Sequence, residues 1–142
     1  ANRMDQSRIL NTLGFFYYTT KDYARAEEYY YRSLEHRLLL YEQNPGVYGD
    51  YVAQIWVNLA LLYAATEVYD KALESIDKAI VLIPDDPDCY DFKGETLLKT
   101  GDTKGALKMW KKVLEISPNY LSEHEEGSEL YNGLKERGLI KE

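Results

Sequence analysis

The sequence is poor in the residues that redox chemistry, metal binding and membrane insertion use. Among 142 residues it has one cysteine and two histidines. Cys89 cannot close a disulfide within the chain, so it says nothing about the redox compartment. No stretch approaches the roughly 18 apolar residues of a transmembrane helix, and the first residues lack the apolar core of a signal peptide. We expect no membrane span, but the compartment stays unknown, because a removed export signal or lipid anchor would leave no trace.

The chain also lacks an excess of positive charge. It has 17 lysines and arginines against 24 aspartates and glutamates, which gives a formal net charge of -7. Binding to a phosphate backbone draws its affinity from basic residues, so nucleic acid is not an expected partner. The one basic cluster is expected to be a solvated outer face of a helix, and it consists of Lys104, Lys108, Lys111 and Lys112.

The residues that could act as a nucleophile or a base do not form a catalytic set. Cys89 and the two histidines, His36 and His124, are far apart in the sequence. His36 is expected at the surface. Cys89 falls three residues after an expected helix start at Asp86, where a thiol pKa can be lowered, but a small residue on a helix favours a structural role. The sequence therefore predicts no catalytic residues and no enzyme.

Metal and cofactor motifs are missing as well. The acidic run at residues 85–91 lacks the glycine and the distal glutamate of an EF-hand loop. The segment 124–126 has one histidine, where the zinc motif H-E-x-x-H needs two. No glycine-rich phosphate loop is found either. The sequence predicts no cofactor and no metal site.

What the chain does contain is an internal repeat of 34 residues. In each copy two small residues alternate with bulky ones, and a proline closes the second and third copies but not the first. Trp56, Ala60, Tyr63, Ala72, Ile76, Ala79 and Pro84 recur as Tyr90, Gly94, Leu97, Ala106, Trp110, Val113 and Pro118. An earlier copy, at an offset of 46, has Leu10, Leu13, Gly14, Tyr17, Tyr23, Ala26, Tyr30 and Ser33. Small residues let two helix backbones approach closely while bulky ones fill the space beside them. Each copy therefore predicts an antiparallel helical hairpin.

The larger offset of the first copy predicts longer helices there. The residues after Leu34 keep a helical composition up to Asn44-Pro45-Gly46. We expect the second helix of repeat one and the first helix of repeat two to be extended. The expected helices cover residues 5–19, 23–43, 48–65, 69–82, 87–99 and 104–115, followed by a short terminal helix. Asp86 before Pro87 is a typical helix start.

At these residues the chain resembles the tetratricopeptide repeat (TPR) family, whose pattern combines aromatic, small and leucine positions with a closing proline. The segments 56–63 and 69–73 carry the match most closely, and the resemblance covers roughly residues 5–120. It implies an all-α fold, an α-solenoid in which three helical hairpins wind into a right-handed superhelix. We expect one TPR-like domain over residues 1–142, with repeats at about 7–52, 53–86 and 87–120.

The segment 121–142 is expected to cap the array. Repeat arrays end in an element that covers the last apolar face with a polar outside. A short helix near residues 128–137 suits this role, with Leu130, Tyr131 and Leu134 docked on repeat three.

The resemblance also implies a binding surface, because the first helices of TPR-like repeats line a concave groove that takes peptides or extended protein segments. Repeats one and two would supply an apolar, aromatic floor, and repeat three would supply acids at helical spacing. A suited partner would carry an apolar anchor and a basic group. The groove residues mapped in this way are Arg8, Asn11, Phe15, Tyr18, Gln54, Val57, Asn58, Leu61, Asp88, Asp91 and Glu95.

One activity of the family is not expected. TPR proteins that clamp the terminal carboxylate of heat-shock chaperones use lysine, asparagine and arginine at five groove positions. Here only Asn58 matches, while the other four positions hold Asn11, Phe15, Asp88 and Phe92.

The sequence thus favours a noncatalytic protein-interaction module. Two alternatives remain open: a docking or sensing fragment of a larger enzyme or signalling protein, and a module for homo-oligomerisation.

Overall fold

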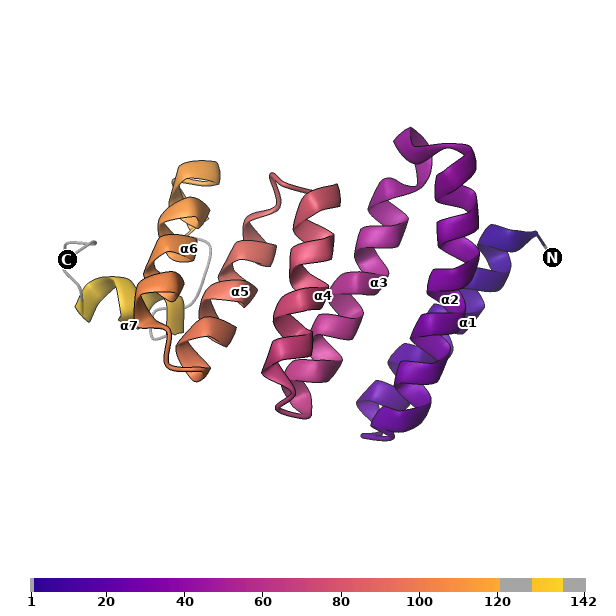
Figure 1. Ribbon diagram of the computed structural model, residues 1–142, viewed down its shortest axis with the longest axis horizontal. Coiled ribbons are helices and arrows are strands. Elements are labelled where there is room, and N and C mark those ends of the chain that lie inside the picture. Colours follow the sequence, from indigo (N-terminus) through magenta and orange to yellow (C-terminus); the bar gives the residue numbers. More distant parts are fainter. Residues whose placement is uncertain (1, 121–128, 137–142) are drawn as a thin grey trace. The chain divides into compact units, whose positions relative to one another are not determined.

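The computed structural model describes residues 2–120 and 129–136, with the side chains of residues 129–131 left aside. Helices and their connecting turns make up this part of the chain, without a strand (Figure 1). The all-helical fold expected from the sequence is confirmed. The helices are α1 (Arg3–Thr19), α2 (Tyr23–Gln43), α3 (Pro45–Ala65), α4 (Tyr69–Leu82), α5 (Pro87–Lys99), α6 (Thr103–Ile116) and α7 (Glu129–Glu136).

The residues form two compact units, one ending at Pro84 and one beginning at Asp85, and each is described by itself. In the first unit α1 packs on α2 and α3 on α4, while α2 also packs on α3. Helices α2 and α3 each run for 21 residues, whereas α4 has 14, so the expected lengthening is confirmed.

Helix α3 begins earlier than the sequence predicts. Its first residue is Pro45 rather than Tyr48. The expected start follows Asn44-Pro45-Gly46, because proline and glycine interrupt helices. A proline at the first helical position is favourable, however, because its fixed φ suits the helix and its missing N–H would have had no partner within the helix.

The turns inside the three hairpins share one backbone geometry. Lys21, Glu67 and Gly101 occupy the same place in each turn and have positive φ values of 64°, 61° and 90°. In the first turn the N–H of Asp22 donates to the carbonyl of Tyr17 at 2.9 Å, and the N–H of Lys21 donates to that of Tyr18 at 3.1 Å. Equivalent pairs close the other two turns. This is the Schellman arrangement, which satisfies the last carbonyls of a helix.

The first hairpin is held together by contact between a glycine and a large ring. A Cβ atom added to Gly14 of α1 would lie 2.5 Å from the ring of Tyr30 in α2. Tyr30 is itself buried, and burial raises its pKa to about 12. The close approach that the sequence pattern predicts is therefore present, and it requires that residue 14 have no side chain.

The second unit consists of α5, α6 and α7. The side chain of Asp86 accepts a hydrogen bond from the N–H of Asp88 at 2.9 Å, and Pro87 is the first helical residue, so the expected helix start is confirmed. Trp110 of α6 is fully buried between two glycines. A Cβ atom at Gly94 of α5 or at Gly133 of α7 would lie within 2.5 Å of its indole ring.

Helix α7 packs on both α5 and α6. Leu134 is fully buried, as the expected capping role requires. Leu130 and Tyr131, which we expected to dock beside it, lie outside the described side chains.

Candidate functional site

Candidate site residues of repeats one and two lie on α1 and α3, where two of them meet, and we call the sides of these helices that carry them the α1–α3 face. Here the side-chain amide of Asn58 donates a hydrogen bond from Nδ2 to Oδ1 of Asn11 at 2.9 Å. Phe15 on α1 is 56% exposed, and Leu61 on α3 is also exposed. The face therefore combines a polar bridge with apolar side chains that are accessible to a partner. The residues that the sequence assigns to this face are Arg8, Asn11, Phe15, Tyr18, Gln54, Val57, Asn58 and Leu61.

Tyr18 and Val57 are only half-buried on this face. The ring of Tyr18 stacks beside that of Phe15, with centroids 6.4 Å apart and planes inclined by 27°. Aromatic pairs favour offset arrangements of this kind. The pair forms a continuous aromatic surface along α1.

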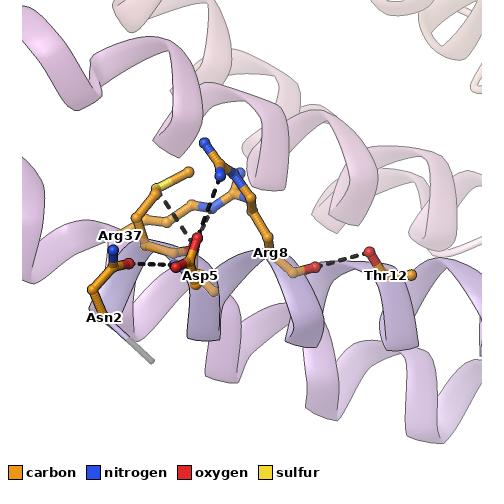
Figure 2. Close-up of polar contacts among 7 residues, drawn as sticks. Asn2, Asp5, Arg8, Thr12 and Arg37 are labelled. Atoms are coloured by element: carbon orange, nitrogen blue, oxygen red, sulfur yellow. Dashed lines mark hydrogen bonds and ion pairs between the residues drawn. The ribbon is translucent and has the colours of Figure 1, made fainter.

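Arg8 lies at the N-terminal end of the same face. Its Nη1 is 3.4 Å from Oδ1 of Asp5, one helical turn earlier, and its carbonyl accepts a hydrogen bond from Thr12 at 2.9 Å (Figure 2). The backbone N–H of Asp5 donates a hydrogen bond to Oδ1 of Asn2 at 2.8 Å, and Asn2 thereby caps the helix. Because the ion pair with Asp5 is exposed, it contributes little to stability and leaves Arg8 available.

Arg37 of α2 is an unforeseen part of the site. The sequence places it in the charged segment 35–37, which resembles a solvated stretch, but only 1% of it is exposed. Its Nε donates to Oγ of Ser7 at 3.1 Å. Its Nη1 donates to the carbonyl of Tyr51 at 2.8 Å and to Oε1 of Gln54 at 2.7 Å. One side chain from α2 thus joins α1 to α3 and fixes Gln54, a candidate site residue.

The partners of Arg37 are neutral, and it makes no ion pair with any carboxylate in the described ranges. Burial, followed by the nearby charge of Arg8, lowers the pKa of Arg37 to about 10, and Tyr51 opposes the shift. The Tyr51 ring lies 5.7 Å from the guanidinium carbon. A guanidinium remains protonated near neutral pH at such a pKa, so a positive charge lies beneath the α1–α3 face.

The candidate acids of repeat three belong to the second unit. Asp88 is exposed, while Asp91 and Glu95 are half-buried. The hydroxyl of Tyr120 lies 2.7 Å from Oδ1 of Asp88 and 3.0 Å from Oδ2 of Asp91. Burial, followed by hydrogen bonding to Asp88, raises the pKa of Tyr120, so its hydroxyl stays protonated and donates.

Sequence reasoning missed Tyr120 because it follows Pro118, at the very end of the repeat pattern. In the sequence, Tyr120 is marked only by its spacing of 34 residues from Asp86, and this spacing does not identify the residues to which its hydroxyl donates. The buried hydroxyl of Tyr120 contacts two of the three candidate acids, Asp88 and Asp91.

The thiol of Cys89 does not have the lowered pKa that its place near a helix start could give. A helix start can lower a thiol pKa, but here burial, followed by the charges of Asp86 and Asp88, raises the pKa of Cys89 to about 12. A buried thiol beside carboxylates resists ionisation because its anion would lose water and meet like charge. Cys89 is therefore an unreactive packing residue.

The other residues considered for chemistry are dispersed. His36 is half-buried, and its Nδ1 lies 3.0 Å from Nη1 of Arg3, whereas His124 lies outside the described residues. Within residues 2–120 and 129–136 no three His, Cys, Asp or Glu side chains gather as a metal site would require. In the same ranges no helix has the length and apolar character needed to cross a bilayer. The four lysines of α6 are all exposed.

The chain matches family models described as tetratricopeptide repeat at residues 7–38, 53–86 and 87–120. These matches cover well over half of the chain. Each of the three matched segments contains one pair of a small residue and a large residue on the two helices of a hairpin: Gly14 and Tyr30, Ala60 and Ile76, or Gly94 and Trp110.

Among curated proteins, the chain is similar to anaphase-promoting complex subunit 7 of Dictyostelium discoideum. The two are 29% identical over an alignment of 134 residues, and the match covers 85% of this chain and 22% of that protein. The chain thus spans less than a quarter of this relative's length.

Two solved structures are similar in fold. The first TPR of Spaghetti (RPAP3), bound to the HSP90 peptide SRMEEVD, has a TM-score of 0.71 at 19% identity, covering 94% of this chain and 91% of that one. The APC/C hetero-tetramer Cut9-Hcn1 has a TM-score of 0.72 at 21% identity, covering 92% of this chain and 23% of the other. At such identities the likeness establishes the fold alone.

Proposed function

We propose, since the chain belongs to the tetratricopeptide repeat family, that it is a noncatalytic module that binds a peptide or an extended protein segment. TPR domains are protein-interaction modules, and one similar structure holds a peptide. The fold alone does not fix a partner. The proposal therefore rests on the α1–α3 face.

The observation that carries the proposal is the exposure of Phe15 and Leu61 beside the Asn11–Asn58 bridge. Exposed apolar side chains that gather with polar groups mark interaction sites. Each asparagine amide has two N–H donors and an acceptor oxygen, so the bridge between them leaves capacity for further hydrogen bonds. An extended peptide presents alternating N–H and carbonyl groups that suit this capacity.

The acidic side chains of α5 predict the charge of a bound group. Asp88, Asp91 and Glu95 favour a basic group on the partner, and Tyr120 holds the first two carboxylates in place. The α1–α3 face is thus expected to bind an apolar anchor, and the acids of α5, which belong to the second unit, are expected to bind a lysine or arginine. Complementary charge of this kind adds specificity and speeds association.

A peptide-display library screened against the whole chain tests the proposal. The selected peptides are then titrated by calorimetry into the chain and into variants Phe15→Ser and Leu61→Ser. Loss of one buried apolar contact is expected to weaken binding by about tenfold or more. Phe16→Ser is the matched control, because Phe16 is the next residue of α1, is 55% exposed and points to another side of the helix. If all variants bind like the original chain, the α1–α3 face is not the site.

An acidic chaperone tail is a poor ligand in this proposal. Asp88 occupies a position where a carboxylate clamp needs a cation, and it would repel a carboxylate. The peptide SRMEEVD should therefore give no measurable heat in the same calorimeter. Saturable binding of that peptide through Asn58 would contradict the proposed ligand chemistry.

The similarity to subunit 7 of the anaphase-promoting complex favours a second candidate, a docking segment of a larger assembly. In that case the same face would contact another subunit rather than a free peptide. Binding by a folded partner and none by any displayed peptide would support this alternative. Homo-oligomerisation remains a third candidate, and light scattering over a range of concentrations tests it.

A further inference from the structure

The second hairpin lacks an aromatic ring that the first hairpin has. In the first hairpin Tyr29 of α2 stacks on Tyr17 of α1, with ring centroids 5.4 Å apart and planes inclined by 11°. At the offset of 46 these two positions correspond to Ser75 of α4 and Tyr63 of α3. One tyrosine of the pair is thus kept in the second hairpin, and the other is replaced by serine.

A hollow lies beside the serine. It has a volume of about 230 Å³, and we call it the Ser75 hollow. Helix α2, which precedes the second hairpin, forms one side of it, and α4 forms the other. An apolar cavity of about 150 Å³ is enough to bind benzene, so the Ser75 hollow has room for one aromatic ring. Its lining includes Tyr31 of α2, Trp56 and Tyr63 of α3, and Lys71, Ser75 and Lys78 of α4.

One cation beside the kept tyrosine occurs in both hairpins. The guanidinium carbon of Arg25 lies 5.5 Å from the centre of the Tyr17 ring. Lys71, its counterpart in α4, has its Nζ 5.6 Å from the centre of the Tyr63 ring. The kept tyrosine therefore has a similar environment in the two hairpins, and the difference is concentrated at position 75.

A second cation covers the ring in the first hairpin and lacks that ring in the second. The guanidinium carbon of Arg32 lies 5.2 Å from the centre of the Tyr29 ring. Its counterpart is Lys78, whose Nζ lies instead 4.3 Å from the centre of the Trp56 ring, at the edge of the hollow. An exposed contact of 3.8 Å with Glu74 constrains this lysine little. Lys78 can therefore turn to cover a ring placed in the hollow.

Ser75 adds a buried polar group without a hydrogen bond to any other described residue. It is 3% exposed, and its side chain lines the hollow. Buried hydroxyl groups are normally hydrogen-bonded, because leaving one unpaired costs free energy. The hydroxyls of Tyr31 and Tyr63, by contrast, lie 3.0 Å apart and satisfy each other. A ligand that brings a hydroxyl to Ser75 would supply the missing partner.

We propose that the Ser75 hollow binds a tyrosine side chain of a partner protein. The bound ring takes the place that Tyr29 has in the first hairpin, where it stacks on Tyr63 and is covered by Lys78. A tyrosine that enters from solvent leads with its hydroxyl, which meets the hydroxyl of Ser75. Phenylalanine would bury Ser75 unpaired, so tyrosine is preferred. This site shares no residue with the α1–α3 face and does not depend on the peptide binding proposed above.

The probe is N-acetyl-tyrosinamide, followed through the indole N–H signals in 15N NMR spectra of the whole chain. Trp56 borders the hollow, whereas Trp110 is buried in the second unit and serves as an internal reference. The Trp56 signal should shift saturably at millimolar concentrations while the Trp110 signal stays in place. N-acetyl-phenylalaninamide should bind about threefold more weakly, and N-acetyl-leucinamide about tenfold more weakly. No saturable shift of Trp56, or equal binding of the three probes, would overturn the proposal.

Substitutions at two positions test where the ring binds. Ser75→Tyr fills the hollow with a ring of the chain itself, as in the first hairpin, and should abolish the Trp56 shift. Ser75→Ala leaves the hollow open but removes the hydroxyl, so the tyrosine and phenylalanine probes should bind equally. Lys78→Gln changes an exposed residue and should weaken both aromatic probes by about threefold. Circular dichroism checks that each variant is folded. Unchanged binding to Ser75→Tyr, or a preference for tyrosine that survives in Ser75→Ala, would contradict the proposal.

A peptide-display library extends the test to a protein partner. Peptides selected on the original chain but not on Ser75→Tyr should contain a tyrosine, and changing that tyrosine to leucine should weaken binding by about tenfold or more. These peptides should bind Phe15→Ser as they bind the original chain, so failure of the α1–α3 face would leave this result intact. If no peptide distinguishes the original chain from Ser75→Tyr, the hollow takes no protein side chain and the proposal fails.

Discussion

The first two hairpins of the chain share a helix arrangement but differ in the residues at the closest approach of the two helices. In α1 and α2 the closest approach pairs Gly14 with the ring of Tyr30. In α3 and α4 the equivalent positions hold Ala60 and Ile76, both buried. The second hairpin thus has a methyl group at Ala60 where the first has Gly14, and its facing side chain, Ile76, is smaller than Tyr30. Interiors are packed to near crystal density, so the two positions vary together.

The hairpins also differ in their neighbours. Helix α3 has α2 on one side and α4 on the other, whereas the stripe of α1 that corresponds to the α2-facing stripe of α3 is exposed. The difference teaches that the repeat pattern sets which positions are apolar, while the next element along the array decides whether they are core or surface.

The largest expected effect comes from one substitution made at both equivalent isoleucines. Ile55→Ala should destabilise the chain by about 2–5 kcal/mol, because it opens a cavity in a fully buried site. Ile9→Ala should change stability by less than about 1 kcal/mol, since its side chain is mostly in water. Urea unfolding followed by circular dichroism measures both. Comparable losses would mean that the α1 stripe is covered and that the comparison fails.

The second effect tests the filling of the first hairpin. Gly14→Ala alone should destabilise by about 1–3 kcal/mol, because the new methyl group meets the Tyr30 ring. Adding Tyr30→Ile recreates the pair of the second hairpin. The double variant should be less unstable than the sum of the single variants by at least about 1 kcal/mol. Strict additivity in the same unfolding experiment would show that these positions are not coupled.

The third effect concerns the side chain that joins the two hairpins. Arg37→Met should cost about 1–3 kcal/mol, because it removes three hydrogen bonds and leaves acceptors on Ser7, Tyr51 and Gln54 without their donor. Arg32→Met on the same helix is the control and should change stability by about 0.5 kcal/mol or less, since Arg32 is exposed. If the two variants are equally stable, Arg37 does not hold α1 to α3.

The smallest effect should be the same in both hairpins. Lys21 and Glu67 adopt left-handed backbone angles in their turns, a conformation that disfavours residues with a side chain. Lys21→Gly and Glu67→Gly should each raise stability by about 0.5 kcal/mol, after the greater freedom of glycine in the unfolded chain is subtracted. Thermal unfolding can resolve this difference. A stabilising effect in only one of the two turns would show that the hairpins do not share their frame at this point.

Much of the fold could be read from the sequence, because the spacing of small and bulky residues reflects how two helices touch. Gly14 and Gly94 are examples: each faces a large ring 16 residues later. The long α2 and α3 could also be inferred, since no helix breaker appears before Asn44. The start of α3 could not, because proline either ends or begins a helix and the local sequence does not decide between the two.

The site was less predictable. Asn11 and Asn58 were placed on one face by their repeat positions, and they do meet. Arg37 and Tyr120 were missed, because their importance depends on partners that lie far away in the sequence. Arg37 has the appearance of a surface charge until Ser7 and Gln54 are seen around it. Repeat spacing gives position, but it does not give hydrogen-bond partners.

The most direct measurement is a 15N NMR titration of the whole chain with a library-selected peptide, observing the side-chain amide groups. Asn11 and Asn58 report on the α1–α3 face, and Gln6 of α1 reports on a hollow between α1 and α2. We predict that the Asn11 and Asn58 signals shift as the peptide saturates while the Gln6 signal stays in place. Movement of Gln6, with Asn11 and Asn58 unchanged, would contradict the proposed binding face.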